Sequence, residues 1–389
     1  MNLDADVVIV GGGAAGIGAA RRLARFSLAT ILLEADSRLG GRAWTQDVAG
    51  LHLDLGCGWF HSADRNAWVR IAEAAGIPID RRLPQWGVQY RDLGFPKADQ
   101  VKARQTFNAW MQRLEHSPPP SDCAADALDP AGEWNNYLRS IVGFISGGSP
   151  EQLSIADYLA YDEASSDFNW RAPSGYGALI AGSLPAQVSH RLSTPVESIA
   201  LGASGATLVT PSGAIRAPAV ILAVSTAVLA GDGLALPTEL TPWREAARLL
   251  PLGRNEKFFL QIVGDAPFET ESQLLGNPRE ARTASYYIRP LGVPVIECFF
   301  GGEGARCIEE GGAAAGFDFA LGQLCALFGA GVRGALRPLA SSGWSRMKHI
   351  GGGYSYALPG HASARTALAQ PFDRRLGHRL EPAPKWTES

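Results

Sequence analysis

The residues from 5 to 42 constrain the fold of this chain more than any other stretch. An apolar run, Val7–Val10, is long enough for one buried strand, and Gly11–Gly16 follows it with the spacing G-x-G-x-x-G. A segment of helical character, Ile17–Phe26, and a second apolar run, Thr30–Leu33, come next. Strand, glycine turn, helix and strand in this order are typical of a βαβ unit in a parallel α/β fold.

The glycines and the acid of this unit predict a dinucleotide site. Gly11 permits a tight turn, Gly13 lets the backbone approach a pyrophosphate, and Gly16 lets helix and strand pack closely. The free N–H groups at the start of the helix then face the phosphates. Glu34, 18 residues after Gly16, can accept a hydrogen bond from a ribose hydroxyl. The alternative is a glycine-rich turn that binds no ligand. The residues expected to bind the dinucleotide here are Gly11, Gly13, Ala14, Ala15, Gly16, Glu34 and Ala35.

A second glycine pair follows the acid in the segment Arg38–Arg42, which has the form R-x-G-G-R. Simple NAD enzymes have no need of it. With this segment the chain resembles the flavin-dependent amine oxidase family, which includes monoamine and polyamine oxidases. Residues 53–61 resemble the family's next stretch, which runs beside the flavin ring. The resemblance implies FAD, with Arg42 near the pyrophosphate and His61 in a structural role. The further flavin contacts that it implies are Gly40, Gly41, Arg42, Gly56, Cys57, Gly58 and Trp59.

Composition excludes several other classes of protein. The 389 residues are enough for two or more domain cores, and a net charge of −3 gives no support to binding of nucleic acid or of an anionic membrane. The five cysteines form no C-x-x-C pair, which argues against a zinc site and against a disulfide framework, and no metal is expected. The first strand leaves no room for a signal peptide, and no apolar run reaches the ~18 residues of a membrane helix. We expect a cytoplasmic, soluble protein; its oligomeric state is left open.

The chain from about 81 to 170 has mostly helical periodicity and no nucleotide motif. Helices are expected over 64–76, 97–115 and 131–146, and Ser154 is expected to cap another short helix. The apolar stripe of the second of these helices consists of Val101, Phe107, Trp110, Met111 and Leu114. The resemblance implies that this insertion is part of a substrate domain.

The chain then returns to the first domain at Gly175–Leu179, a segment that resembles the family's re-entry into the FAD domain. Strands are expected over 196–199, 206–210, 214–216 and 219–224, and Thr241-Pro242 is expected to begin a helix. In relatives the backbone at the position of Val196 meets the adenine. A buried strand residue is the alternative for Val196, and both can hold together.

Lys257 is the first candidate catalytic residue. It lies in an expected strand, 256–262, behind the leader Leu250–Gly253. A lysine in such a strand is usually an exposed charge, but the resemblance implies a lysine that holds a water against flavin N5. Residues 285–288 and 293–300 predict a hairpin, and 313–329 an apolar helix.

Tyr354 is the second candidate. The segment Gly351–Gly360 contains Gly-Tyr-Ser-Tyr and resembles the family's stretch near the reactive face of the flavin, where Tyr354 would form one wall of an aromatic cage for the amine. A packed tyrosine is the alternative. Relatives with covalent flavin carry cysteine just before this tyrosine, whereas this chain has Gly353, so the resemblance implies non-covalent FAD.

The resemblance covers residues 5 to about 376. Beyond it the family continues into a Phe-Ala-Gly-Glu strand and a glycine-rich helix, whereas residues 377–389 are polar and contain prolines, and we expect a disordered tail. Because the family's closing segment supplies flavin contacts and the second cage tyrosine, we also expect weak retention of FAD.

These observations predict an α/β protein with a Rossmann-like FAD-binding domain and an inserted α+β substrate domain. The expected boundaries are 1–80, 171–246 and 346–376 for the FAD domain, and 81–170 and 247–345 for the substrate domain. The implied reaction is oxidation of an amine by hydride transfer to FAD, with O2 reduced to H2O2. Two alternatives remain: another oxidase or desaturase of the same superfamily, and a truncated chain that folds without turnover.

Overall fold

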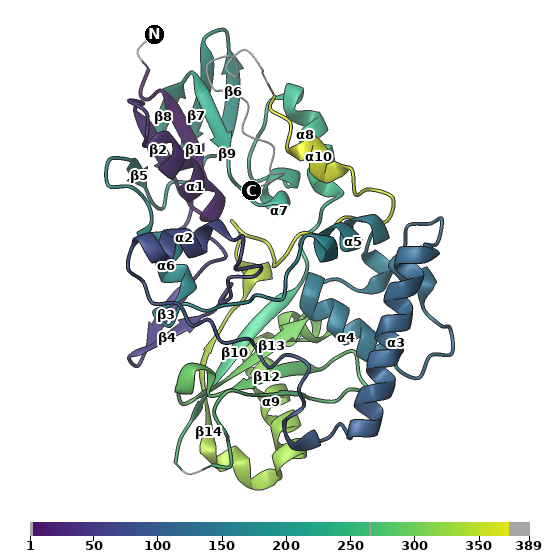
Figure 1. Cartoon of the computed structure of the whole chain (residues 1–389). Helices are drawn as coiled ribbons and strands as arrows, with labels where there is room; N and C mark the ends of the chain where they lie inside the picture. The colour runs from purple at the N-terminus through teal and green to yellow at the C-terminus, as the bar shows by residue number, and fades with distance from the viewer. Residues whose placement is uncertain (1–2, 265, 373–389) are drawn as a thin grey trace.

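The computed structural model describes residues 3–264 and 266–372, and its N-terminal part is built on a parallel sheet (Figure 1). The order is β5-β2-β1-β9, and each neighbouring pair is parallel. The strands are β1 (Val7–Val10), β2 (Thr30–Leu33), β5 (Ser189–Arg191) and β9 (Ala219–Leu222). Because parallel strands end at the same edge, the turn after β1 and the acid after β2 lie close together.

Both faces of this sheet are covered. One face packs against α1 (Ala14–Leu23), with Ile9, Ala20 and Leu32 in a shared core. The other face packs against a three-stranded antiparallel sheet, so that Val8 and Leu208 belong to a second core. That sheet consists of β6 (Ser198–Gly202), β7 (Gly205–Thr210) and β8 (Gly213–Ala217). β1 and β2 are buried along their whole length, as uninterrupted apolar strands in such a layered fold must be.

A five-stranded antiparallel sheet forms the lower part of Figure 1, in the order β11-β12-β13-β10-β14. Its strands are β10 (Asn255–Ile262), β11 (Ser272–Leu275), β12 (Ala284–Ile288), β13 (Val295–Gly301) and β14 (Leu336–Ser341). The long helix α9 (Glu303–Phe328) covers one face, where Leu324 packs with Phe258 and Phe300.

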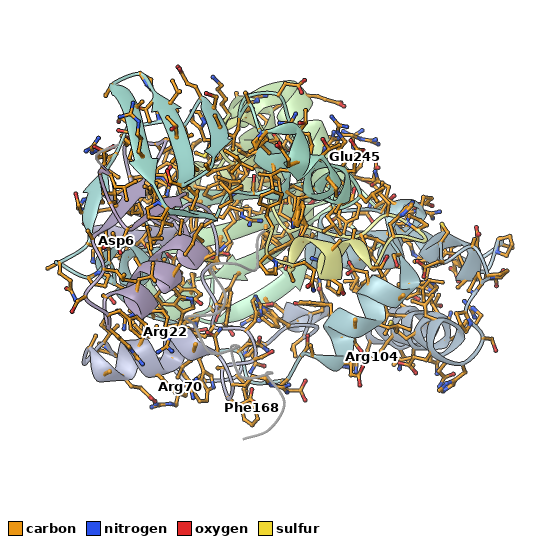
Figure 2. The ribbon with its side chains drawn as sticks, turned by 90° about the horizontal axis from the view of Figure 1, so that it is seen from above. Asp6, Arg22, Arg70, Arg104, Phe168 and Glu245 are labelled. Atoms are coloured by element: carbon orange, nitrogen blue, oxygen red, sulfur yellow. The ribbon has the colours of Figure 1, made fainter. Side chains whose placement is uncertain are left out.

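Helices and a hairpin complete the described chain. Helices α3 (Lys97–His116), α4 (Asn135–Ser146) and α5 (Ile155–Glu163) lie beside the antiparallel sheet (Figure 1). The hairpin is formed by β3 (Thr45–Val48) and β4 (Leu51–Asp54). The remaining helices are α2 (Ala67–Ala74), α6 (Tyr176–Gly182), α7 (Thr226–Ala230), α8 (Thr241–Arg248) and α10 (Ala364–Leu368). Arg22, Arg70 and Arg104, which are labelled in Figure 2, are examples of exposed charged residues on the helices.

Several details differ from the sequence predictions. The helix expected from 64 begins at Ala67, because the side chain of Asn66 accepts a hydrogen bond from the Trp68 N–H and caps it there. Val101 is 47% exposed, so it does not belong to the apolar stripe, whereas Trp110 and Leu114 are fully buried. The tail expected over 377–389 lies outside the described residues.

Two helix starts also differ. Thr241 is the first residue of α8 and not its cap; its hydroxyl donates to the carbonyl of Thr238 in the preceding turn. The helix expected over 313–329 begins ten residues earlier, at Glu303, because the chain continues through a break at Gly312 (φ 82°). Only glycine adopts that conformation without strain, and a glycine pair in a sequence reads as an end to a helix.

By length and composition α9 could cross a membrane, contrary to the expectation that no segment is apolar enough. Its mean hydropathy over an 18-residue window is 1.3, and 22% of that window is buried. In this structure Ala320, Leu321 and Leu324 of α9 belong to the core of the antiparallel sheet.

Candidate active site

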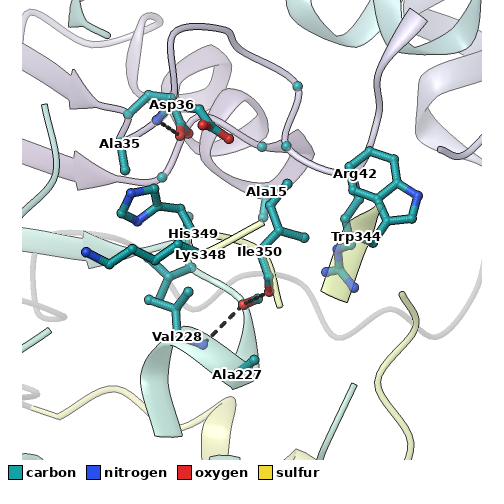
Figure 3. A pocket seen from close by; sticks show the side chains of 18 of the residues that line it. Ala15, Ala35, Asp36, Arg42, Ala227, Val228, Trp344, Lys348, His349 and Ile350 are labelled. Atoms are coloured by element: carbon teal, nitrogen blue, oxygen red, sulfur yellow. Dashed lines mark hydrogen bonds between the residues drawn. The ribbon is translucent and has the colours of Figure 1, made fainter. Parts of the chain in front are cut away.

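A cavity of about 930 Å³ runs from the carboxyl edge of the parallel sheet to the antiparallel sheet. Its volume is at the upper end of the range for ligand pockets, which suits an extended ligand. In the view of Figure 3, Arg42 and Trp344 lie at one end, and Ala35 and Asp36 lie toward the other. The predicted site residues that line it are Gly11, Gly13, Ala14, Ala15, Glu34, Ala35, Gly40, Gly41, Arg42, Gly56, Cys57, Val196, Lys257 and Tyr354.

The turn after β1 has the geometry of a phosphate cradle. Gly11 has a φ of 107°, which disfavours any other residue, and a Cβ there would lie 2.6 Å from the carbonyl oxygen of Ala223. Gly16 does not line the cavity; a Cβ on it would lie 1.9 Å from the carbonyl oxygen of Gly11, so it lets α1 pack against the turn as predicted. The start of α1, at Ala14 and Ala15, therefore opens directly into the cavity with its unpaired N–H groups.

Glu34 is buried at the end of β2, with 8% of its surface exposed. Its carboxylate accepts hydrogen bonds from the N–H groups of Gly12 (2.6 Å) and Asp36 (2.8 Å). These bonds fix the carboxylate beside the glycine turn, at the edge of the cavity where a ribose hydroxyl is expected. Val196 lies just before β6 instead of inside it, and it lines the cavity as well.

Arg42 joins the second glycine pair to the C-terminal part of the described chain. Its guanidinium donates to the carbonyl oxygen of Gly353. Gly56 packs beneath it so closely that a Cβ would lie 1.7 Å from the carbonyl oxygen of Arg42. Trp344 is held nearby, because its indole N–H donates to the carbonyl of Leu55 over 3.3 Å. Gly56 lines the cavity without a side chain, which leaves room for a planar ring.

Lys257 is buried in β10 at 7% exposure, against the usual behaviour of a strand lysine. Its ammonium forms an ion pair with Glu297 of β13 (2.8 Å) and donates to the carbonyl of Asp54 (3.2 Å). The side chain of Asp54 accepts from Thr45 and from two backbone N–H groups, and burial raises the pKa of this carboxyl above its ordinary value. Gly58 leaves room for the lysine, since a Cβ on it would lie 3.4 Å from Lys257 Nζ.

Aromatic side chains border the region around Lys257. Tyr354 lines the cavity and is 42% exposed. Trp59, expected at the flavin, lies outside the cavity wall: it stacks with Tyr287 at a centroid distance of 6.0 Å and contacts Trp86 edge-on at 4.9 Å. His61 also lies outside, where its Nδ1 is 2.8 Å from the amide oxygen of Asn169. Cys57 lines the cavity, and burial raises its thiol pKa to about 12.

The sequence analysis did not identify several lining residues. Leu222–Ser225 could have been found, because the end of a strand parallel to β1 must reach the same edge of the sheet. Asn255 and Phe299 share a sheet face with Lys257, which follows from the register only once the pairing is known. Lys348 and His349 also line the cavity (Figure 3), but no local pattern marks them.

A family model described as "Flavin containing amine oxidoreductase" matches residues 14–108 and 90–376. The chain belongs to this family. It is therefore an FAD-containing enzyme of the amine oxidoreductase class, as the resemblance implied, and the α/β fold with an FAD-binding domain is confirmed. The family model and the relatives support neither alternative, a different oxidase of the superfamily or a chain without turnover, better than they support amine oxidation.

Individual relatives agree with the family. The chain is 28% identical to pseudooxynicotine dehydrogenase from Pseudomonas sp, over 68% of this chain and 60% of that protein. It is 27% identical to L-amino acid dehydrogenase from Synechocystis sp., with 98% and 90% covered, and 25% identical to polyamine oxidase 2 from Arabidopsis thaliana, with 91% and 78% covered. Cyclohexylamine oxidase from Brevibacterium oxydans has a similar fold, with a TM-score of 0.74, 19% identity, and 95% and 91% covered.

The cavity fits FAD. The N–H groups of α1 and the close approach at Gly11–Gly13 suit a pyrophosphate, and the carboxylate of Glu34 suits a ribose. Gly56, which lines the cavity without a side chain, leaves room for the flat ring system. Gly353 offers no thiol for attachment, in agreement with non-covalent binding.

Proposed function

We propose that this chain oxidises an amine substrate at the end of the cavity that contains Lys257 and Tyr354. The carbon beside the nitrogen loses a hydride, the nitrogen loses a proton, and the resulting imine hydrolyses to an aldehyde or ketone. FAD, when bound, accepts the hydride and passes its electrons to O2, which forms H2O2. The observation that carries the proposal is a buried lysine in the same cavity as a dinucleotide cradle.

The residues of the chain have separate tasks in this proposal. The ammonium of Lys257 has three N–H donors, of which Glu297 and the carbonyl of Asp54 use two. The third is left to hold a water molecule in the cavity. Tyr354 offers an aromatic face to the substrate nitrogen, since aromatic faces attract cations and exclude water.

The proposal also includes O2 as the acceptor of the electrons from the flavin. Some relatives bear the name oxidase and others dehydrogenase, so O2 has to be tested against other acceptors. A suitable panel contains putrescine, cyclohexylamine, an L-amino acid and pseudooxynicotine, chosen from the names of relatives.

The test measures two quantities for each substrate: bleaching of the flavin absorbance without O2, and the H2O2 formed with O2. Bleaching by at least one amine, with one H2O2 formed per substrate consumed, is the expected result. Bleaching without H2O2, together with turnover on an artificial dye, would show a dehydrogenase. No bleaching by any amine at full FAD occupancy contradicts the proposed substrate class.

A further inference from the structure

Glu297 contacts the proposed catalytic lysine and belongs to none of the motifs described above. It lies in β13, opposite Phe259 of β10, while Phe299 lies opposite Lys257. Opposed residues in an antiparallel pair share a face, so Lys257 and Glu297 are diagonal neighbours on one face of the sheet. The side chain of Lys257 is buried, at 9% exposure, that of Glu297 is partly buried, at 16%, and their charged atoms are 2.8 Å apart.

The other carboxylates near Lys257 are occupied elsewhere. The side chain of Asp54 accepts hydrogen bonds from Thr45 and from the backbone N–H groups of Tyr176 and Gly177. Glu256 precedes Lys257 in the strand and points to the opposite face, where it accepts from Ser342 and from the Trp344 N–H. Among the residues that the structure describes, Glu297 is thus the carboxylate in ion-pair contact with Lys257.

This ion pair restricts where the lysine side chain can go. A lysine has a flexible four-carbon stem, and without a fixed partner its ammonium samples many positions. Glu297 on one side and the carbonyl of Asp54 on the other hold the nitrogen at two points. With two of its three N–H groups bound to fixed partners, the ammonium cannot rotate freely. The direction of its third N–H group is therefore fixed as well.

We propose that Glu297 is a positioning residue, which acts on the reaction by holding the ammonium of Lys257 at the cavity wall. The inference rests on the proposed function of Lys257 and adds a residue to it. Two other roles for Glu297 make different predictions: a purely structural ion pair, and direct binding of a cationic substrate.

The test is a double-mutant cycle with Lys257→Met, Glu297→Gln and the two combined. Glu297→Gln keeps the shape of the side chain and removes its charge. Glu310→Gln is the matched control, because Glu310 is an exposed carboxylate in the same part of the fold. FAD content and Tm of every variant are measured first, so that a folding defect is recognised.

Two readouts follow. The first is the rate of flavin reduction by the amine and of reoxidation, each by stopped flow. The second is the midpoint potential of the bound flavin against a reference dye. Glu297→Gln is expected to slow the same half-reaction as Lys257→Met, by about tenfold, the usual effect of losing a charged hydrogen bond. Both single variants should shift the potential in the same direction, and the double variant should equal Lys257→Met within about twofold in rate.

Each other outcome has a definite meaning. Additive rate effects, or a change only in KM that persists in the Lys257→Met background, would show that Glu297 acts on the substrate directly. A lower Tm with unchanged rates and potential would show a structural ion pair. Either result overturns the inference and leaves the role of Lys257 intact. If Lys257→Met itself changes neither half-reaction, the proposed role of Lys257 is wrong and this inference fails with it. The proposal of amine oxidation is tested separately, by flavin bleaching and H2O2 formation with the unmodified chain.

Discussion

The N–H of Gly12 donates to the carboxylate of Glu34 over 2.6 Å, and this bond joins the turn after the first strand to the end of the second. The same carboxylate also accepts from Asp36. A residue placed for a ribose therefore has a second task, to satisfy two backbone donors in the protein itself.

Glu34→Ala is expected to lower both FAD affinity and the stability of the FAD-free protein. Loss of the acceptor leaves two donors unsatisfied, which costs about 1–3 kcal/mol for each buried group, and FAD loses a charged partner for its ribose. Kd from fluorescence titration and Tm of the FAD-free protein measure the two effects. Asp6→Ala is the control, since Asp6 accepts from the N–H of Ala29 (2.7 Å) outside the cavity; equal FAD affinity in both variants would remove Glu34 from the site.

Replacement by alanine is expected to have opposite effects on stability at two glycines of α1. In Gly16→Ala the new Cβ would lie 1.9 Å from the carbonyl oxygen of Gly11, so α1 must move away from the turn and the phosphate cradle must open. Nothing lies within 4 Å of a Cβ at Gly18, so Gly18→Ala should stabilise the helix by roughly 0.5–1 kcal/mol. Tm and FAD content of both variants test this, and a Gly16→Ala protein with normal FAD content contradicts the packing described.

Glu256 is expected to make stability depend on pH. Burial, and then the charge of Glu309, raise its pKa to about 7. An acid whose pKa is higher in the folded state than in the unfolded state destabilises the fold as pH rises from the unfolded value, about 4.3, to the folded one. In Glu256→Gln the amide oxygen can accept from the Trp344 N–H and the NH2 group can donate to the Ser342 hydroxyl, which replaces the present bond in the reverse direction. The stability of this variant, relative to that of the unmodified chain, should therefore rise by roughly 1–3 kcal/mol from pH 5 to pH 8. Unfolding by urea across this range measures the difference, and parallel stability curves would contradict it.

Tyr354 is expected to contribute to amine binding through its ring. Tyr354→Phe keeps the aromatic face and should leave KM within about threefold, whereas Tyr354→Ala should raise KM by roughly five- to thirtyfold, the range of a partly desolvated cation–π contact. Initial rates with one amine give both values. Phe168→Ala is the control, because Phe168 is also exposed (47%; Figure 2) and does not line the cavity. Equal KM values for the two tyrosine variants would assign Tyr354 to packing.

The rate of flavin reduction is expected to rise with pH through the pKa of the substrate amine. The neutral amine is the hydride donor, and protonation of its nitrogen removes the lone pair that stabilises the developing cation. For two substrates whose amine pKa values differ, the pH profiles of the reduction rate should therefore be displaced from each other by that difference in pKa. A pH profile that is identical for all substrates would instead show that the titration of a group of the protein controls the rate.

Most of the residues that the sequence assigned to the nucleotide line one cavity of the structure, and their contact with FAD stays a prediction. In the segment from Gly11 to Arg42 each residue acts through its own backbone or through a neighbour along the chain, and such effects appear as spacing. The break of α9 at Gly312 escaped prediction because a glycine in an apolar helix looks like its end. Glu297, Lys348 and His349 escaped for another reason: they reach the site by strand pairing and by a loop, and neither leaves a local pattern.

The bond from Arg42 to Gly353 joins residues 311 positions apart. Contacts of such high sequence separation form late, because the chain between them must first be ordered. During synthesis, the βαβ unit at the N-terminus can emerge and begin to fold long before its far partner has been translated. The complete cradle thus forms only after the segment around Gly353 has been made, and cofactor loading is expected to follow the synthesis of that segment.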